Sequence, residues 1–145
     1  MSRRRRDIRR LFPNPPRTIL RPMNGVGVIC VHHDEEARRA ARAIVNGAPG
    51  FDIVGEAGSA EEALELAMAL RPSLALVAVG MPGIDGFETS RRLIAALPST
   101  TVVLLYASVE PSEETLVGSQ AVAALQDEAL TPAALRTLWN EHGAG

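Results

Sequence analysis

The chain has 145 residues, of which 46% are hydrophobic and 3% aromatic, so we expect one domain with a core of Leu, Val, Ile and Ala. No run of about 18 apolar residues occurs, which excludes a membrane span. The single cysteine, Cys30, lies in an apolar strand pattern, which indicates a small buried residue and the reducing cytoplasm.

The charge is uneven along the chain. Residues 1–22 carry eight Arg and one Asp, whereas residues 23–145 carry seven Arg and sixteen acids, and there is no Lys. The acidic part is therefore not expected to bind nucleic acid. We interpret residues 1–23 as a disordered Arg- and Pro-rich tail and residues 24–145 as the folded domain. A basic arm could contact nucleic acid, an acidic partner or an anionic membrane. We favour translation from Met23, because a strand begins directly after it.

From there, strand and helix patterns alternate. Buried strands are predicted at 26–31, 52–56, 74–79, 101–106 and 121–125, and helices at 34–46, 59–70, 86–97, 113–117 and from 132 onward. Asp34 is a candidate cap, Ser59 opens a capping box, and Thr131 precedes a proline at the first helical position. The apolar stripe of the first helix comprises Ala37, Ala40, Ala41, Ile44 and Val45, and that of the last comprises Leu135, Leu138, Trp139 and His142.

Five apolar strands joined by helices predict a parallel sheet covered on both faces, that is, a doubly wound α/β sandwich with strand order 2-1-3-4-5. In such a sheet, functional groups gather at the carboxyl ends of the strands. The residues there are His32, His33 and Asp34 after the first strand, Ala78 at the third, Tyr106 at the fourth and Gln126 at the fifth.

Most of the chain, from Val26 to about His142, resembles the receiver domains of response regulators. The matching stretches are VGVICVHHDEEARRAARAIV, FDIVGEAGSAEEALELA, RPSLALVAVGMPGIDGFETSRRLIAALP and TVVLLYAS. The resemblance implies a flavodoxin-like (βα)5 three-layer sandwich. It also implies a site in which an Asp accepts a phosphoryl group, carboxylates hold Mg²⁺, a Lys neutralises charge and a Ser or Thr binds the phosphate.

Carried over position by position, this site is altered throughout. The acidic pair falls on His32 and His33, the phosphoacceptor on Ala78, the Ser or Thr on Tyr106, and the Lys on Gln126. The switch aromatic of strand 5 falls on Ala123, and the segment between Ala107 and Gln126 is about two residues short. What survives is the loop Met81, Pro82, Gly83, Ile84, Asp85 and Gly86. We therefore expect a degenerate receiver with no phosphorylation, no Mg²⁺ dependence and no cofactor.

Three residue groups allow two interpretations each. His32, His33 and Asp34, with Asp85, are weak candidates for a transition-metal site, and the alternative is ordinary strand-end polar residues. Tyr106 either fills the volume left by Ala78 and locks the loop, or points outward. Trp139, with Leu116 and Val117, either belongs to a partner face or packs the last helix on the sheet.

The leading functional hypothesis is a stand-alone regulatory domain in a two-component type pathway. It would act through protein–protein contacts or as a homodimer, on the face that the resemblance assigns to helix 4, strand 5 and helix 5. One alternative is a sensor that binds a small molecule through Gln126, Tyr106 and the histidines. Another is the receiver part of a DNA-binding transcription regulator. An enzyme is not expected, because no Ser–His–acid or Cys–His set occurs at suitable positions.

Overall fold

The computed structural model describes residues 25–143, so the expectations of a tail over 1–23 and of a start at Met23 lie outside the described residues. Five strands alternate with helices in this part of the chain. They run in the order β1 (Val26–Val31), α3 (Glu35–Asn46), β2 (Phe51–Ala57), α4 (Ala60–Leu70), β3 (Leu74–Ala78), α5 (Gly86–Ala96), β4 (Thr101–Tyr106), α6 (Glu113–Ser119), β5 (Ala123–Gln126), the short 3₁₀ helix η1 (Asp127–Ala129) and α7 (Pro132–His142).

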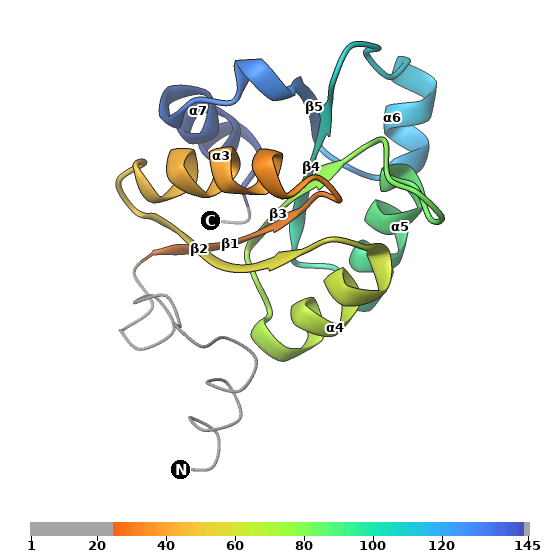
Figure 1. Ribbon diagram of the computed structural model, residues 1–145, viewed down its shortest axis with the longest axis horizontal. Helices are drawn as coiled ribbons and strands as arrows, with labels where there is room; N and C mark the ends of the chain where they lie inside the picture. Colours follow the sequence, from red (N-terminus) through yellow and green to blue (C-terminus); the bar gives the residue numbers. More distant parts are fainter. Residues whose placement is uncertain (1–24, 144–145) are drawn as a thin grey trace.

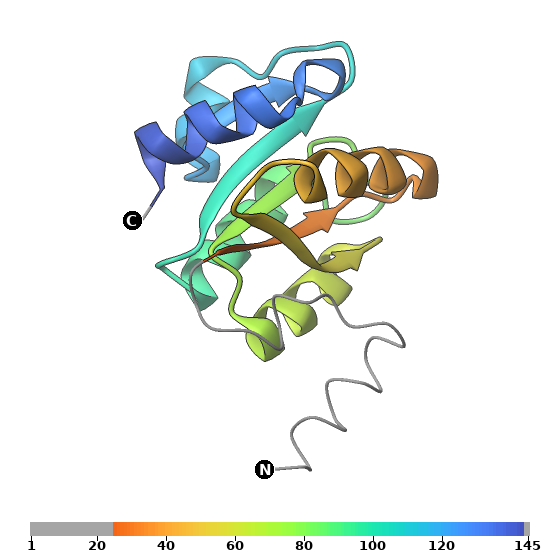
Figure 2. The ribbon, with the colours of Figure 1, turned by 90° about the vertical axis from the view of Figure 1, so that its left-hand side faces the viewer.

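The strands form one sheet with the order β2-β1-β3-β4-β5, and every pair is parallel. The arrowheads of β1, β2 and β4 accordingly point the same way in Figure 2. The predicted fold class and strand order are therefore confirmed.

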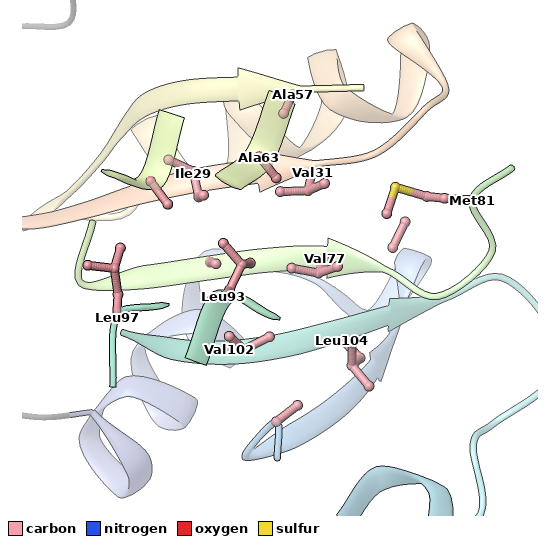
Figure 3. Close-up of a cluster of buried hydrophobic side chains, with 14 of the residues drawn as sticks. Ile29, Val31, Ala57, Ala63, Val77, Met81, Leu93, Leu97, Val102 and Leu104 are labelled. Carbon is pink, nitrogen blue, oxygen red and sulfur yellow. The ribbon is translucent and has the colours of Figure 1, made fainter. Parts of the chain in front are cut away.

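Helices cover both faces of this sheet (Figure 1). Because side chains alternate along each strand, every inner strand supplies both faces. Ile29, Val77 and Leu104 pack into a cluster with α4 and α5, shown in Figure 3. The neighbouring residues Val28, Leu76 and Leu105 pack into a second cluster with α3 and α7. The result is a three-layer sandwich with a core on each side of the sheet.

Helix caps follow the sequence signals. The side chains of Asp34, Ser59 and Thr131 each accept a hydrogen bond from a backbone N–H in the first turn of the helix that follows. Two stripe assignments were wrong, because Ala40 and His142 are exposed. Alanine is too small to mark a buried helix face by itself. His142 is the last residue of α7, and its ring lies 3.8 Å from the Glu141 carboxylate.

Cys30 and Trp139 both belong to the α3–α7 side of the molecule. Cys30 is fully buried, and burial raises its pKa to about 12, which confirms a small buried residue. The Trp139 ring meets Phe51 edge to face, with ring centroids 6.4 Å apart. Leu116, which the partner-face interpretation grouped with Trp139, packs against the other cluster. The interpretation of Trp139 as a helix-packing residue is confirmed, and whether this helix also contributes to a partner face stays a prediction.

Candidate functional site

The residues singled out from the sequence lie at the carboxyl ends of neighbouring strands. Val31 pairs with Val77 next to the end of β3, Ala78 pairs with Leu105, and Tyr106 pairs with Gln126. His32, Ala78, Tyr106 and Gln126 are therefore at or directly after the ends of β1, β3, β4 and β5. In the strand order of the sheet, β3 lies between β1 and β4, so its end is at the centre of this row. The end of β1 is on one side, and the ends of β4 and β5 are on the other.

At the centre of the row, Ala78 offers only a methyl group and is 2% exposed. The backbone of Gly86 lies directly against it. A Cβ at position 86 would overlap the Ala78 carbonyl oxygen and stand 2.7 Å from the Val79 Cα. Glycine is thus required where α5 begins, because the helix start closes tightly on the end of β3.

The polar groups of the loop over residues 81–86 hold its shape. The Asp85 carboxylate accepts a hydrogen bond from the Glu88 N–H at 2.9 Å and caps α5, and the Gly86 N–H donates to the Val79 carbonyl oxygen at 2.9 Å. Gly83 has φ +77°, a conformation that glycine adopts without strain. Met81 is buried, and its side chain turns back toward the cluster in Figure 3. The loop therefore has an architectural role, and Asp85 acts as a helix cap.

His32 and His33 follow β1 directly, and their rings stack with centroids 5.4 Å apart. The Nδ1 atom of His32 accepts a hydrogen bond from the Asp34 N–H at 3.1 Å, so the neutral ring carries its proton on Nε2. An Arg38 guanidinium N–H donates to the His32 carbonyl oxygen at 2.5 Å. Burial lowers the pKa of His32, and the neighbouring His33 and Arg38 lower it further, while Asp127 and Asp34 oppose them.

The polar atoms of His32 and Asp34 form hydrogen bonds at the start of α3. The Asp34 carboxylate accepts from the Glu36 N–H at 3.1 Å, and the His32 Nδ1 is occupied by the Asp34 N–H. Within residues 25–143, no three His, Cys, Asp or Glu side chains gather in an arrangement that could hold a metal ion. In the described residues, His32 and Asp34 end a strand and cap a helix, and their role as weak metal candidates stays untested.

On the other side of the row, Tyr106 and Gln126 end β4 and β5 side by side. The amide nitrogen Nε2 of Gln126 donates to the Ala107 carbonyl oxygen at 3.0 Å. This bond ties the end of β5 to the start of the loop between β4 and α6. Tyr106 is half-buried, and the alternation of β4 places it on the same face as Val102 and Leu104. Whether its ring locks the loop stays a prediction.

Asp127 is a residue that the sequence reasoning missed. It directly follows Gln126, opens η1 and is half-buried. Burial raises its pKa, and the nearby charge of His32 partly opposes that shift. Asp127 therefore places a carboxyl group near the end of β1. The available signal was an acidic residue immediately after a strand end, in a stretch where only Gln126 had been considered.

Residues 28–130 match the response regulator receiver domain family. The chain belongs to this family. It is 37% identical over 98 residues to protein-glutamate methylesterase/protein-glutamine glutaminase 4 of Myxococcus xanthus, covering 68% of this chain and 28% of that protein. It is 32% identical over 80 residues to the response regulator GacA of Pseudomonas aeruginosa, covering 55% of this chain and 37% of that protein.

Solved receiver domains have the same fold. The signal receiver domain of NarL from Mycobacterium tuberculosis superposes with a TM-score of 0.67 at 25% identity, covering 79% of this chain and 96% of that one. The receiver domain of a modulated diguanylate cyclase from Desulfovibrio desulfuricans gives 0.69 at 25% identity, with 81% and 92% covered.

The chain spans well under half of the curated relatives named above, 28% and 37% of their lengths. What matches the family model is a receiver domain, so the methylesterase and glutaminase activities in the name of the Myxococcus relative are not carried over. As a receiver, the chain belongs to two-component signalling. Within residues 25–143, no helix is long and apolar enough to cross a membrane.

Proposed function

We propose that this receiver domain regulates a two-component type pathway in the cytoplasm through protein–protein contacts and without being phosphorylated. The observation that carries the proposal is Ala78, a buried residue with no nucleophilic oxygen, at the end of the central strand β3. The resemblance to receivers assigns the phosphoacceptor to this position. A phosphoryl transfer to the domain would need a carboxylate there.

The groups around Ala78 support the same conclusion. Where the resemblance expects Mg²⁺ ligands, His32 uses its Nδ1 in the start of α3, and imidazole is a poor ligand for Mg²⁺. Where the resemblance expects a lysine, the chain has Gln126, which is uncharged. The Gln126 amide N–H donates a hydrogen bond to the Ala107 carbonyl oxygen. A phosphoryl group at this edge would lack nucleophile, metal and cation together.

The partner face that we propose consists of α6, β5 and α7. β5 is at the edge of the sheet, and all four of its residues are half-buried, unlike those of the inner strands. Val117 on α6 and Val122 just before β5 are exposed, at 69% and 36%. A face with an open strand edge and exposed valines is suited to a protein partner or a second copy of the chain.

The test is an NMR titration with beryllofluoride and Mg²⁺, and separately with acetyl phosphate and Mg²⁺. We expect no change in the amide resonances of residues 78–86, while a receiver that keeps the acidic residues, recorded alongside, responds. A saturable shift in these residues would refute the proposal. If a metabolite set raises the melting temperature while no partner binds, the sensor hypothesis would replace the docking one.

A second candidate is the receiver part of a DNA-binding regulator. It is favoured by the 35% identity over 80 residues to the DNA-binding transcriptional activator DevR/DosR of Mycobacterium tuberculosis, of which the chain covers 37%. The genomic reading frame downstream of the codon for Gly145 tests it. A DNA-binding domain encoded in frame would favour this candidate, and a stop codon would exclude it.

A further inference from the structure

The outer side of α6 and the loop before it expose apolar side chains. Val109 in the loop is 79% exposed and Val117 on α6 is 69% exposed. With Val122, they are three of the four exposed large hydrophobic residues in the described part of the chain, the fourth being Met68 on α4. In Figure 1, α6 lies at the upper right, at the outside of the molecule. Single exposed valines are ordinary, but three in one stretch between β4 and β5 mark a candidate contact surface.

The same stretch has charge of one sign. Residues 93–135 contain five acids, Glu110, Glu113, Glu114, Asp127 and Glu128, and no Lys, Arg or His. Glu110, Glu113 and Glu114 are exposed, and none of them forms an ion pair within the described residues. Elsewhere, Glu35, Glu56 and Glu88 are paired with arginines. We define the α6 surface as Val109, Glu110, Glu113, Glu114 and Val117.

The chain itself contains a segment with the complementary chemistry. Residues 1–22 carry eight Arg and one Asp, together with apolar residues that include Ile8, Leu11 and Phe12. We propose that, in the protein translated from Met1, residues 1–22 bind the α6 surface of the same molecule. This inference rests on the proposed function, because the α6 surface is part of the proposed partner face. A bound arginine-rich segment would compete with a partner for α6.

Chain length allows binding within one molecule. Twenty-two residues extend up to about 70 Å, at roughly 3.3 Å per residue. The path from β1 to β5 crosses three strand spacings, which is about 15 Å. Contacts between exposed guanidinium and carboxylate groups are individually weak and are screened by salt. Several such contacts together with the valines are needed, so binding should weaken as ionic strength rises.

The experiment is limited trypsin digestion of the full chain, with cleavage at arginines in residues 1–22 followed by mass spectrometry. We expect Glu113→Gln/Glu114→Gln, and separately Val109→Ser/Val117→Ser, to raise the cleavage rate in this segment at least threefold at low salt. The matched control Glu61→Gln/Glu65→Gln removes two exposed acids from α4 and should leave the rate unchanged. The wild-type rate should not depend on protein concentration, and a rate that falls as the concentration rises would overturn binding within one molecule in favour of a second copy.

Equal cleavage in the wild type and both α6 variants would overturn the inference, as would an equal increase in the α4 control. An intact mass of the native protein that begins at Met23 would overturn it as well. None of these results affects the beryllofluoride test, which probes residues 78–86. Failure of this inference and failure of the proposed function can therefore be told apart.

Discussion

The loop after β3 and the stretch after β5 lie at the same edge of the sheet, but their polar groups have different uses. In the loop, Asp85 caps α5 and Gly86 bonds the Val79 carbonyl oxygen, so these groups fix the backbone. After β5, Gln126 reaches one backbone oxygen, and Asp127 is half-buried near His32. Residues 81–86 shape the backbone, whereas Ala78 and Gln126 hold positions at which we propose that phosphoryl chemistry has been lost.

Gly86→Ala should give the largest effect on stability, because Gly86 belongs to the loop whose polar groups fix the backbone after β3. The new Cβ would overlap the Ala78 carbonyl oxygen, and the end of β3 and the start of α5 must move apart. We expect the free energy of unfolding to fall by about 3 kcal/mol or more, measured by urea denaturation.

Gly80→Ala is the matched control, since a Cβ at position 80 meets nothing within 4 Å. It should change the free energy of unfolding by less than about 0.5 kcal/mol. Comparable losses in the two variants would mean that the close approach of Gly86 to Ala78 is not what stabilises the loop.

An intermediate effect is expected from pH, through His32. Its pKa is lowered mainly by burial, so the unfolded chain binds this proton more tightly than the folded one. The contribution of His32 to the free energy of unfolding should be fully present above the ordinary value of 6.5 and be lost as the pH falls below it. Urea denaturation across this range in the wild type and in His32→Gln isolates the effect, which should disappear in the variant.

The contribution of Asp127 to the pH dependence of stability has the opposite sign to that of His32, so it needs its own control. Its pKa is raised by burial, so the folded protein binds that proton more tightly and gains stability as the pH falls. Repeating the His32 comparison in an Asp127→Asn background removes this contribution. If the pH dependence is the same with and without His32 in that background, the assignment to His32 is wrong.

Much of the molecule could be predicted from local patterns. Strand patterns and caps such as Ser59 and Thr131 predicted the elements, because these signals depend on neighbours in sequence. The sheet order followed from the doubly wound architecture that apolar strands joined by helices favour. The role of Asp127 could not be predicted in this way, since its burial and its proximity to His32 arise only when β1 and β5 share one sheet. Trp139 was ambiguous for the same reason, because a helix stripe does not say which neighbour, here Phe51, it meets.

The smallest effect on stability is expected at Gln126, at the end of β5, which makes one exposed hydrogen bond to a backbone oxygen. Its hydrogen bond to the Ala107 carbonyl oxygen is exposed, so its loss can be replaced by water. Gln126→Ala should lower the free energy of unfolding by less than about 1 kcal/mol, while hydrogen exchange in residues 107–111 becomes faster. Gln126→Met keeps the length of the side chain but not the donor, and should speed exchange to the same extent. If Gln126→Met preserves the slow exchange, then packing of the side chain, and not the hydrogen bond, holds residues 107–111 in place. The end of β5 would then help to fix the backbone, as the loop after β3 does.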